Sequence, residues 1–176
     1  MHTTKFKNIV REYKNLVYSQ ALYSTGNRYD AADITQEVLI KLWDNMDGIK
    51  LHSVKPWLLK VTRNCCIDLS RKKREKYFSE FDDNDEENSI PEIATPANDP
   101  DPEQSLDKAE AQHRIFEAIK ELPEKIRTTL ILRYIHDETY DVIAEIVGCP
   151  LNSIKVYLHR GRKLLAQALK EPVQEK

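Results

Sequence analysis

Apolar residues recur at spacings of three and four along most of the chain, a pattern that predicts amphipathic helices. Three such helices are expected before residue 79. The first covers about residues 6–22, the second begins at Asp30 as its N-cap, and the third begins at Ser53 as its N-cap. Three helices in so short a stretch form a small bundle.

The periodicity stops over residues 79–107, where four of the eight prolines fall and apolar residues are sparse. The stretch from Asp82 to Glu87 holds five carboxylates and one asparagine. Self-repulsion and the lack of apolar surface oppose folding, so this stretch is predicted to be a flexible, disordered linker.

Helical periodicity returns from about Ser105 and runs to Leu122, where Pro123 stops it. Further helices are expected over about 124–135, 140–147 and 152–169. The first of these is expected to turn Ile126, Leu130, Ile131 and Tyr134 inward. The sequence therefore predicts an all-α chain of two small helical domains, an N-terminal helix bundle and a C-terminal helix-turn-helix bundle. Their predicted bounds are 1–78 (the front module), 79–107 (the acidic linker) and 108–176 (the back module).

The segment 140–160 carries the strongest local pattern. Ala144 supplies a small residue where two helices cross, and Gly148 supplies the positive φ that ends the first of them. Pro150 blocks its continuation, and Asn152 or Ser153 is expected to cap the second helix. Turning Ile154 and Leu158 inward leaves a cationic, hydrogen-bonding face suited to a DNA major groove. Its members are Ser153, Lys155, Val156, His159, Arg160 and Arg162. The plainer interpretation is an αα-hairpin with an ordinary solvated basic face.

Charge is segregated along the chain, although the net charge is only -2. Residues 1–78 hold 15 Lys/Arg against 8 Asp/Glu, a net of +7. Residues 79–107 hold 11 Asp/Glu and no Lys/Arg, a net of -11, and residues 108–176 hold 12 against 10, a net of +2. Basic blocks beside an acidic one indicate contact with nucleic acid.

The composition argues against a secreted protein and against a membrane-spanning one. The N-terminal residues lack the apolar stretch of a secretory signal, and no apolar run reaches the roughly 18 residues that span a bilayer. Cys65, Cys66 and Cys149 are odd in number and form no Cys-x-x-Cys pair, which favours reduced thiols in a cytoplasm. We therefore expect a cytoplasmic protein with no membrane insertion, no metal and no cofactor.

Two front-module motifs and one back-module motif together resemble the extracytoplasmic-function group of bacterial RNA polymerase sigma factors. The first is a D-x-x-Q-E motif closed by an aromatic residue, here Asp33, Gln36, Glu37 and Trp43. The second follows a W-L-x-x-V-x-x-N pattern with a downstream D-x-x-R-K, here Trp57, Leu58, Val61, Asn64, Asp68, Arg71 and Lys72. The third, ahead of the helix-turn-helix, is met by Leu122, Pro123, Arg127, Leu132 and Arg133.

The resemblance implies a role for each surface. The helix with Asp33, Gln36, Glu37, Lys41 and Trp43 would dock on the β′ clamp helices of core RNA polymerase. The third helix would hold the downstream (-10) promoter element, with Asn64 on a base of the opened strand and cations on phosphates: Lys60, Arg63, Arg71, Lys72, Lys73 and Arg74. The recognition helix would read the upstream (-35) element through Asn152, Ser153, Lys155, Val156, His159, Arg160 and Arg162.

Further partners follow from the same resemblance, namely the polymerase β flap and an anti-sigma factor. The acidic linker would either thread the RNA exit path of the polymerase or act as a solubilising spacer. Gly161 and Tyr157 depart from the family pattern, and Gly161 is expected to cost about 1 kcal/mol in helix propensity. Trp57 is expected in the core, and Asp68 is expected to pair with a nearby cation.

The expected function is that of a sigma factor with no catalysis of its own, which directs promoter recognition, DNA melting and initiation. One alternative is a stand-alone helix-turn-helix regulator that acts on promoter DNA without docking to polymerase. An enzyme or metal protein is disfavoured, because the cysteines and the five histidines form no ligand pattern.

Overall fold

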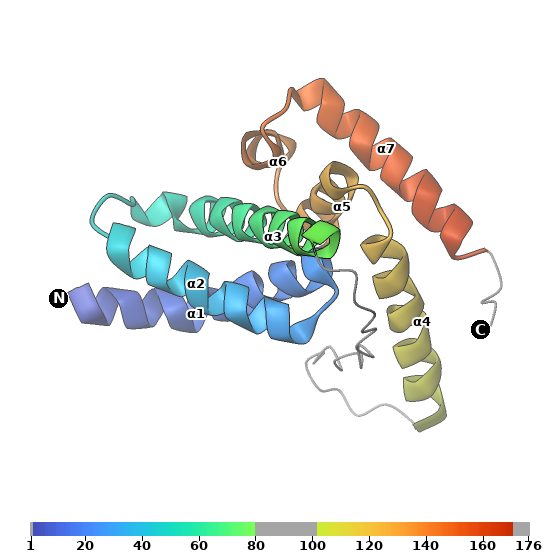
Figure 1. The fold of residues 1–176 in the computed structure, drawn as a ribbon, viewed down its shortest axis with the longest axis horizontal. Coiled ribbons are helices and arrows are strands. Elements are labelled where there is room, and N and C mark those ends of the chain that lie inside the picture. Colours follow the sequence, from blue (N-terminus) through green and yellow to red (C-terminus); the bar gives the residue numbers. More distant parts are fainter. Residues whose placement is uncertain (1, 80–101, 171–176) are drawn as a thin grey trace.

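The structure, a computed structural model, describes residues 2–79 and 102–170, and these residues form helices joined by short turns (Figure 1). The first three helices form the front module, and the remaining ones form the back module. The elements are α1 His2–Thr25, α2 Arg28–Asn45, η1 Leu51–Ser53, α3 Val54–Ser79, α4 Pro102–Lys120, α5 Glu124–Leu130, the π-helical turn η2 Ile131–Ile135, α6 Tyr140–Val147 and α7 Leu151–Ala168.

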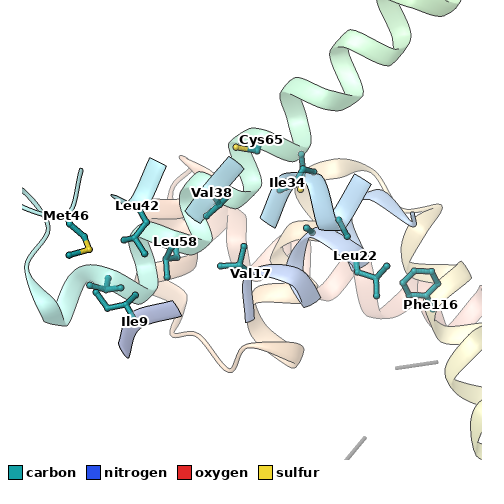
Figure 2. Packing of buried hydrophobic residues seen from close by; sticks show 14 residues of the cluster. Ile9, Val17, Leu22, Ile34, Val38, Leu42, Met46, Leu58, Cys65 and Phe116 are labelled. Atoms are coloured by element: carbon teal, nitrogen blue, oxygen red, sulfur yellow. The ribbon is translucent and has the colours of Figure 1, made fainter. Parts of the chain in front are cut away.

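The front module is a three-helix bundle around a continuous apolar core. Val17 of α1, Val38 and Leu42 of α2 and Leu58 of α3 are fully buried and meet at its centre (Figure 2). Trp57 packs against this core, as expected, and Asp68 pairs with Arg71 at 3.4 Å.

The back module has a second core, built from α5, α6 and α7. Leu130, Ile143, Ile154 and Leu158 are buried there, which confirms the inward face predicted for the last helix. In Figure 1, α5 and α6 lie between α3 and α7, and α7 forms the outer edge of the molecule.

The two modules are docked, and each contributes a side chain to the core of the other. Leu59 of α3 has no exposed surface and belongs to the back core, while Phe116 of α4 packs on Tyr23 with ring centroids 5.4 Å apart. Figure 2 places Phe116 at the end of the front core, beside Leu22. Two ion pairs cross the same junction, Lys55–Glu138 at 2.6 Å and Arg63–Glu124 at 3.0 Å.

Several predicted boundaries need correction. Asn27, not Asp30, caps α2, because its side-chain oxygen accepts from the backbone N–H groups of residues 29 and 30. Neither Asn152 nor Ser153 caps α7, since Pro150 occupies the N-cap position without a side-chain bond. Helix α4 begins at Pro102, inside the predicted linker, so residues 102–107 are helical. The rest of that linker prediction, residues 80–101, lies outside the described residues.

The segment after α5 was also predicted incorrectly. It was expected to continue as one helix to Ile135 with Tyr134 inward, but residues 131–135 form a π turn and the Tyr134 side chain is 56% exposed. A π turn adds one residue to a helical turn, so the side chains that follow it point in other directions than in a continuous α-helix. His136 and Glu138 become buried in its place.

Candidate nucleic-acid and polymerase interfaces

Helix α7 is placed by the tight turn that precedes it. Thr139 caps α6 through a bond from the Val142 N–H, and Gly148 ends the helix in the left-handed conformation with φ of 71°. Its N–H donates to the Ala144 carbonyl at 2.9 Å. A side chain at Gly148 would be strained at this φ, so glycine is the residue that permits the turn.

The outward face of α7 matches the predicted recognition surface. Ile154 and Leu158 point into the core, and the opposite side is exposed to solvent, with Ser153 half-buried at its edge. Val156 is 45% exposed and places an apolar side chain among the cations of this face. The exposed members of this face are Asn152, Lys155, Val156, His159, Arg160 and Arg162.

Gly161 lies on the inner side of the same helix and has a packing role. It is buried, and an added Cβ would lie 2.7 Å from Leu130 Cδ1 and 2.9 Å from Ile126 Cγ2. The glycine therefore allows α7 to approach α5 closely. The loss of helix propensity expected from the sequence accompanies a contact that alanine would disturb.

Helix α3 carries the predicted downstream-element residues on more than one side. Lys60, Asn64 and Arg71 are exposed and follow a helical spacing of four and seven, so they share one face. The cations at 72, 73 and 74 are also exposed. Lys73, however, pairs with Asp30 of α2 at 2.6 Å, on the side of α3 that faces α2.

Arg63 does not lie free on that surface. Its side chain is only 14% exposed, its Nε donates to Glu124 at 3.0 Å, and its guanidinium reaches the Ile146 carbonyl at 3.4 Å. In the docked arrangement this predicted DNA contact is therefore bound to the back module.

Helix α2 presents the predicted polymerase-binding residues together. Asp33, Gln36, Glu37 and Trp43 are exposed, and Lys41 is half-buried beside them. Trp43 keeps 43% of its surface exposed while it meets Phe6 edge-on at 5.0 Å.

An ion pair orders the middle of this face. Lys41 Nζ lies 2.6 Å from Glu37 Oε1 and 3.3 Å from Cys65 Sγ. The hydrogen bond from Lys41 lowers the pKa of Glu37, and the bond to Glu37 raises the pKa of Lys41. Both groups are therefore charged across the physiological range, although an exposed pair of this kind adds little stability.

The sequence reasoning missed several exposed apolar residues. Ile40 is 63% exposed on α2, and its spacing from Gln36 and Glu37 could have identified it as part of the same face. On the back module, Tyr134, Ile135 and Tyr140 are exposed near Arg133, which stacks on the Tyr140 ring at 5.5 Å. No sequence signal marked the π turn that brings this second group outward.

The cysteines and histidines provide no visible centre for chemistry. Cys65 and Cys66 are buried and Cys149 is half-buried, and all three are free. Burial raises the pKa of the Cys66 thiol to about 12. Across residues 2–79 and 102–170, no three His, Cys, Asp or Glu side chains gather in a way that could hold a metal ion. The helices in these ranges are also too short or too polar to cross a membrane.

Comparison with known proteins matches both modules. The family model "Sigma-70 region 2" covers residues 9–76, and "Sigma-70, region 4" covers residues 112–165. The ECF RNA polymerase sigma factor SigW of Bacillus subtilis (strain 168) is 30% identical over 94% of this chain and 89% of its own length. SigE of Mycolicibacterium smegmatis is 28% identical over 92% of this chain and 60% of its length.

A solved structure shows the same fold. The sigma factor RpoE from Bartonella quintana, crystallised with the anti-sigma factor NepR, aligns with a TM-score of 0.76 at 22% identity. The alignment covers 96% of this chain and 99% of that one.

Proposed function

This chain belongs to the extracytoplasmic-function group of the sigma-70 family of RNA polymerase sigma factors, and from that premise we propose which surface performs each step of initiation. A sigma factor binds core RNA polymerase and directs it to promoters. The observation that carries the assignment is the separation of three exposed surfaces, one each on α2, α3 and α7.

The α7 face reads the upstream promoter element. Its exposed polar and cationic side chains run along one side of the helix from Asn152 to Arg162 and fit a major groove. A good base contact there contributes about 1–3 kcal/mol of discrimination. Lys155 and Arg160 flank the face, where they meet phosphates or base edges. Phosphate contacts set the affinity and its salt dependence.

The α3 face holds the opened strand of the downstream element. Asn64 is exposed between Lys60 and Arg71, so an amide with both donor and acceptor lies among cations. Arg63 joins this surface only after it leaves Glu124 and the Ile146 carbonyl. A contact of Arg63 with the opened strand therefore requires the modules to separate at this point.

The α2 face docks on the polymerase clamp. Ile40 and Trp43 give it an apolar centre, and Asp33, Gln36 and Glu37 give it a polar rim, which is the usual anatomy of a protein interface. This face is exposed while the modules are docked, so polymerase binding does not require prior opening. The exposed aromatic group at Tyr134 and Tyr140 is a second docking surface, suited to the β flap.

The remaining roles follow from this division. The front module binds the polymerase clamp and the opened DNA strand, and the back module reads duplex DNA. The acidic linker tethers the two modules. The 22 residues at 80–101, between α3 and α4, have a contour length of at most roughly 75 Å, enough for separated sites. The chain acts in the cytoplasm without catalysis of its own. As in the Bartonella complex, an anti-sigma factor is its expected regulator.

The test is a charge reversal on α7. Lys155→Glu with Arg160→Glu should abolish initiation at promoters that depend on the upstream element, because two contacts to DNA become repulsive. The matched control, Arg11→Glu with Lys14→Glu, reverses two exposed cations on α1 and should leave start sites unchanged. Unaltered promoter choice by the α7 variant would show that this face does not read DNA.

A further inference from the structure

A cavity of about 770 Å³ lies at the junction of the docked modules. Helix α3 forms one wall with Arg63, Ile67 and Arg74, and the α4–α5 region forms the other with Lys120 and Arg127. Its volume falls within the roughly 300–1,000 Å³ typical of small-molecule sites. Clefts between domains are a frequent location for such sites.

The lining has an excess of positive charge. Five cations face two carboxylates, a net of +3, and serine and threonine hydroxyls add neutral hydrogen-bonding groups. The carboxylates are Glu75 and Glu124, and the cations are Arg63, Arg71, Arg74, Lys120 and Arg127. Glu124 pairs with Arg63, while Lys120 and Arg71 pair with carboxylates outside the lining, Glu117 at 3.5 Å and Asp68 at 3.4 Å. Arg74 and Arg127 are therefore the lining cations that form no ion pair with another described residue.

Of Arg74 and Arg127, Arg127 is the more buried. Its guanidinium donates to the neutral Lys120 carbonyl at 2.7 Å, and no carboxylate in the described ranges lies within ion-pair distance of it. Burial lowers its pKa, even though the charges of Glu124, Cys66 and Glu121 act in the other direction. A partly buried guanidinium of this kind favours an anion with paired oxygens, such as a phosphate.

The same cavity has an apolar section. Ile67 of α3 faces Leu122 and Pro123 of the α4–α5 turn across it. A ligand that combined several phosphates with a flat ring system would satisfy both parts of the lining. Inorganic phosphate alone would leave the apolar section uncovered.

We propose that this cavity binds a nucleoside polyphosphate, with its phosphates on Arg74, Lys120 and Arg127 and its base against Ile67, Leu122 and Pro123. The ligand bridges both modules and so stabilises the docked arrangement. Arg71 and Arg74 also belong to the proposed downstream-element surface. Occupation of the cavity therefore opposes promoter binding, a consequence that rests on the function proposed above.

Isothermal titration calorimetry of the full chain tests the site without polymerase or promoter. ATP and GTP are titrated beside inorganic triphosphate and adenosine, which carry the phosphates and the ring separately. The expected result is one nucleotide per chain, weaker binding of triphosphate and no binding of adenosine. Arg74→Gln with Lys120→Gln should weaken nucleotide binding roughly tenfold or more.

The matched control is Lys50→Gln with Lys125→Gln, which removes two exposed cations outside the cavity. The affinity of this control variant for ATP and GTP should stay within about twofold of the affinity of the parent chain. The proposal fails if neither ATP nor GTP gives saturable binding, or if the control weakens binding as much as the cavity variant. Since the assay contains no transcription step, a chain that binds nucleotide yet starts no transcript would overturn only the proposed function.

Discussion

Gly161 shows how one residue can be misjudged from helix propensity alone. In sequence it is a weak point of a DNA-reading helix, and in the structure it is the contact that lets α7 lie on Leu130 and Ile126. Propensity describes an isolated helix, whereas the packed helix also has to fit its neighbours.

We expect Gly161→Ala to destabilise the protein. Overpacking of a filled core costs about 1–3 kcal/mol, and the gain in propensity returns about 1 kcal/mol, so the net loss is up to ~2 kcal/mol. Gly48→Ala is the control, because the nearest atom to its added Cβ is 3.7 Å away. Urea unfolding measures the stability of both variants. Greater stability of the Gly161 variant would mean that the contact is looser than described.

Titration of His136 makes the free energy of unfolding depend on pH. Burial, with a smaller effect from the nearby Lys55 charge, lowers the pKa of His136 to about 4. An unfolded histidine has a pKa of about 6.5, so between these values the unfolded chain binds the extra proton. This contribution to stability is present above pH 6.5 and is lost as the pH falls towards 4.

The pH prediction is therefore a loss of order 3 kcal/mol in unfolding free energy between pH 7 and pH 4 from this group. His136→Gln removes the titration and should flatten that part of the profile. The charged groups beside it are Lys55 and Glu138, which form an ion pair at 2.6 Å. A profile for the variant that follows the parent would assign the pH dependence to other groups.

At the scale of elements, the sequence predicted best where local rules decide the outcome. The end of α6 and the left-handed Gly148 follow from a glycine and a proline, which act within a few residues. The N-caps predicted at Asp30 and at Asn152 or Ser153 were wrong. The π turn at residues 131–135 has no such local signal. The turn packs against α5, α6 and α1, the last of which lies far away in the sequence, so Tyr134 was placed incorrectly and the burial of His136 and Glu138 was not predicted.

The start of α2 gives a test at this scale. Asn27→Ala should cost about 1 kcal/mol, because two backbone N–H groups at the helix start lose their acceptor. Asn8→Ala, which removes an exposed contact to Arg11 on α1, should change stability by less than about 0.5 kcal/mol. Equal effects from the two variants would argue against Asn27 as the cap.

At the scale of the whole molecule, the candidate surfaces were predictable but their relation was not. The motifs predicted candidate surfaces on three helices, and the structure has these residues mostly exposed on α2, α3 and α7. Their roles toward polymerase, opened strand and duplex stay predictions. The docking that buries Leu59 and Phe116 across the junction depends on long-range contacts that no periodicity encodes. For the same reason the engagement of Arg63 by Glu124 could not be foreseen.

Weakening the junction should open the molecule. Glu124→Gln with Glu138→Gln removes the carboxylate partners of Arg63 and Lys55, and the mostly buried Arg63 guanidinium is left without a charged partner. Small-angle scattering should show a larger radius of gyration than for Glu12→Gln with Glu145→Gln, which changes two exposed carboxylates. An unchanged radius would mean that the apolar contacts alone hold the docked form.

As a whole, this chain is expected to give core RNA polymerase its promoter specificity. Run-off transcription with purified core enzyme, the full chain and a promoter library, followed by mapping of the 5′ ends, tests it most directly. We expect discrete start sites that need the chain and core enzyme together and that are lost with Lys155→Glu and Arg160→Glu. Tight binding of promoter DNA by the chain alone, with no start site in the presence of core enzyme, would contradict it.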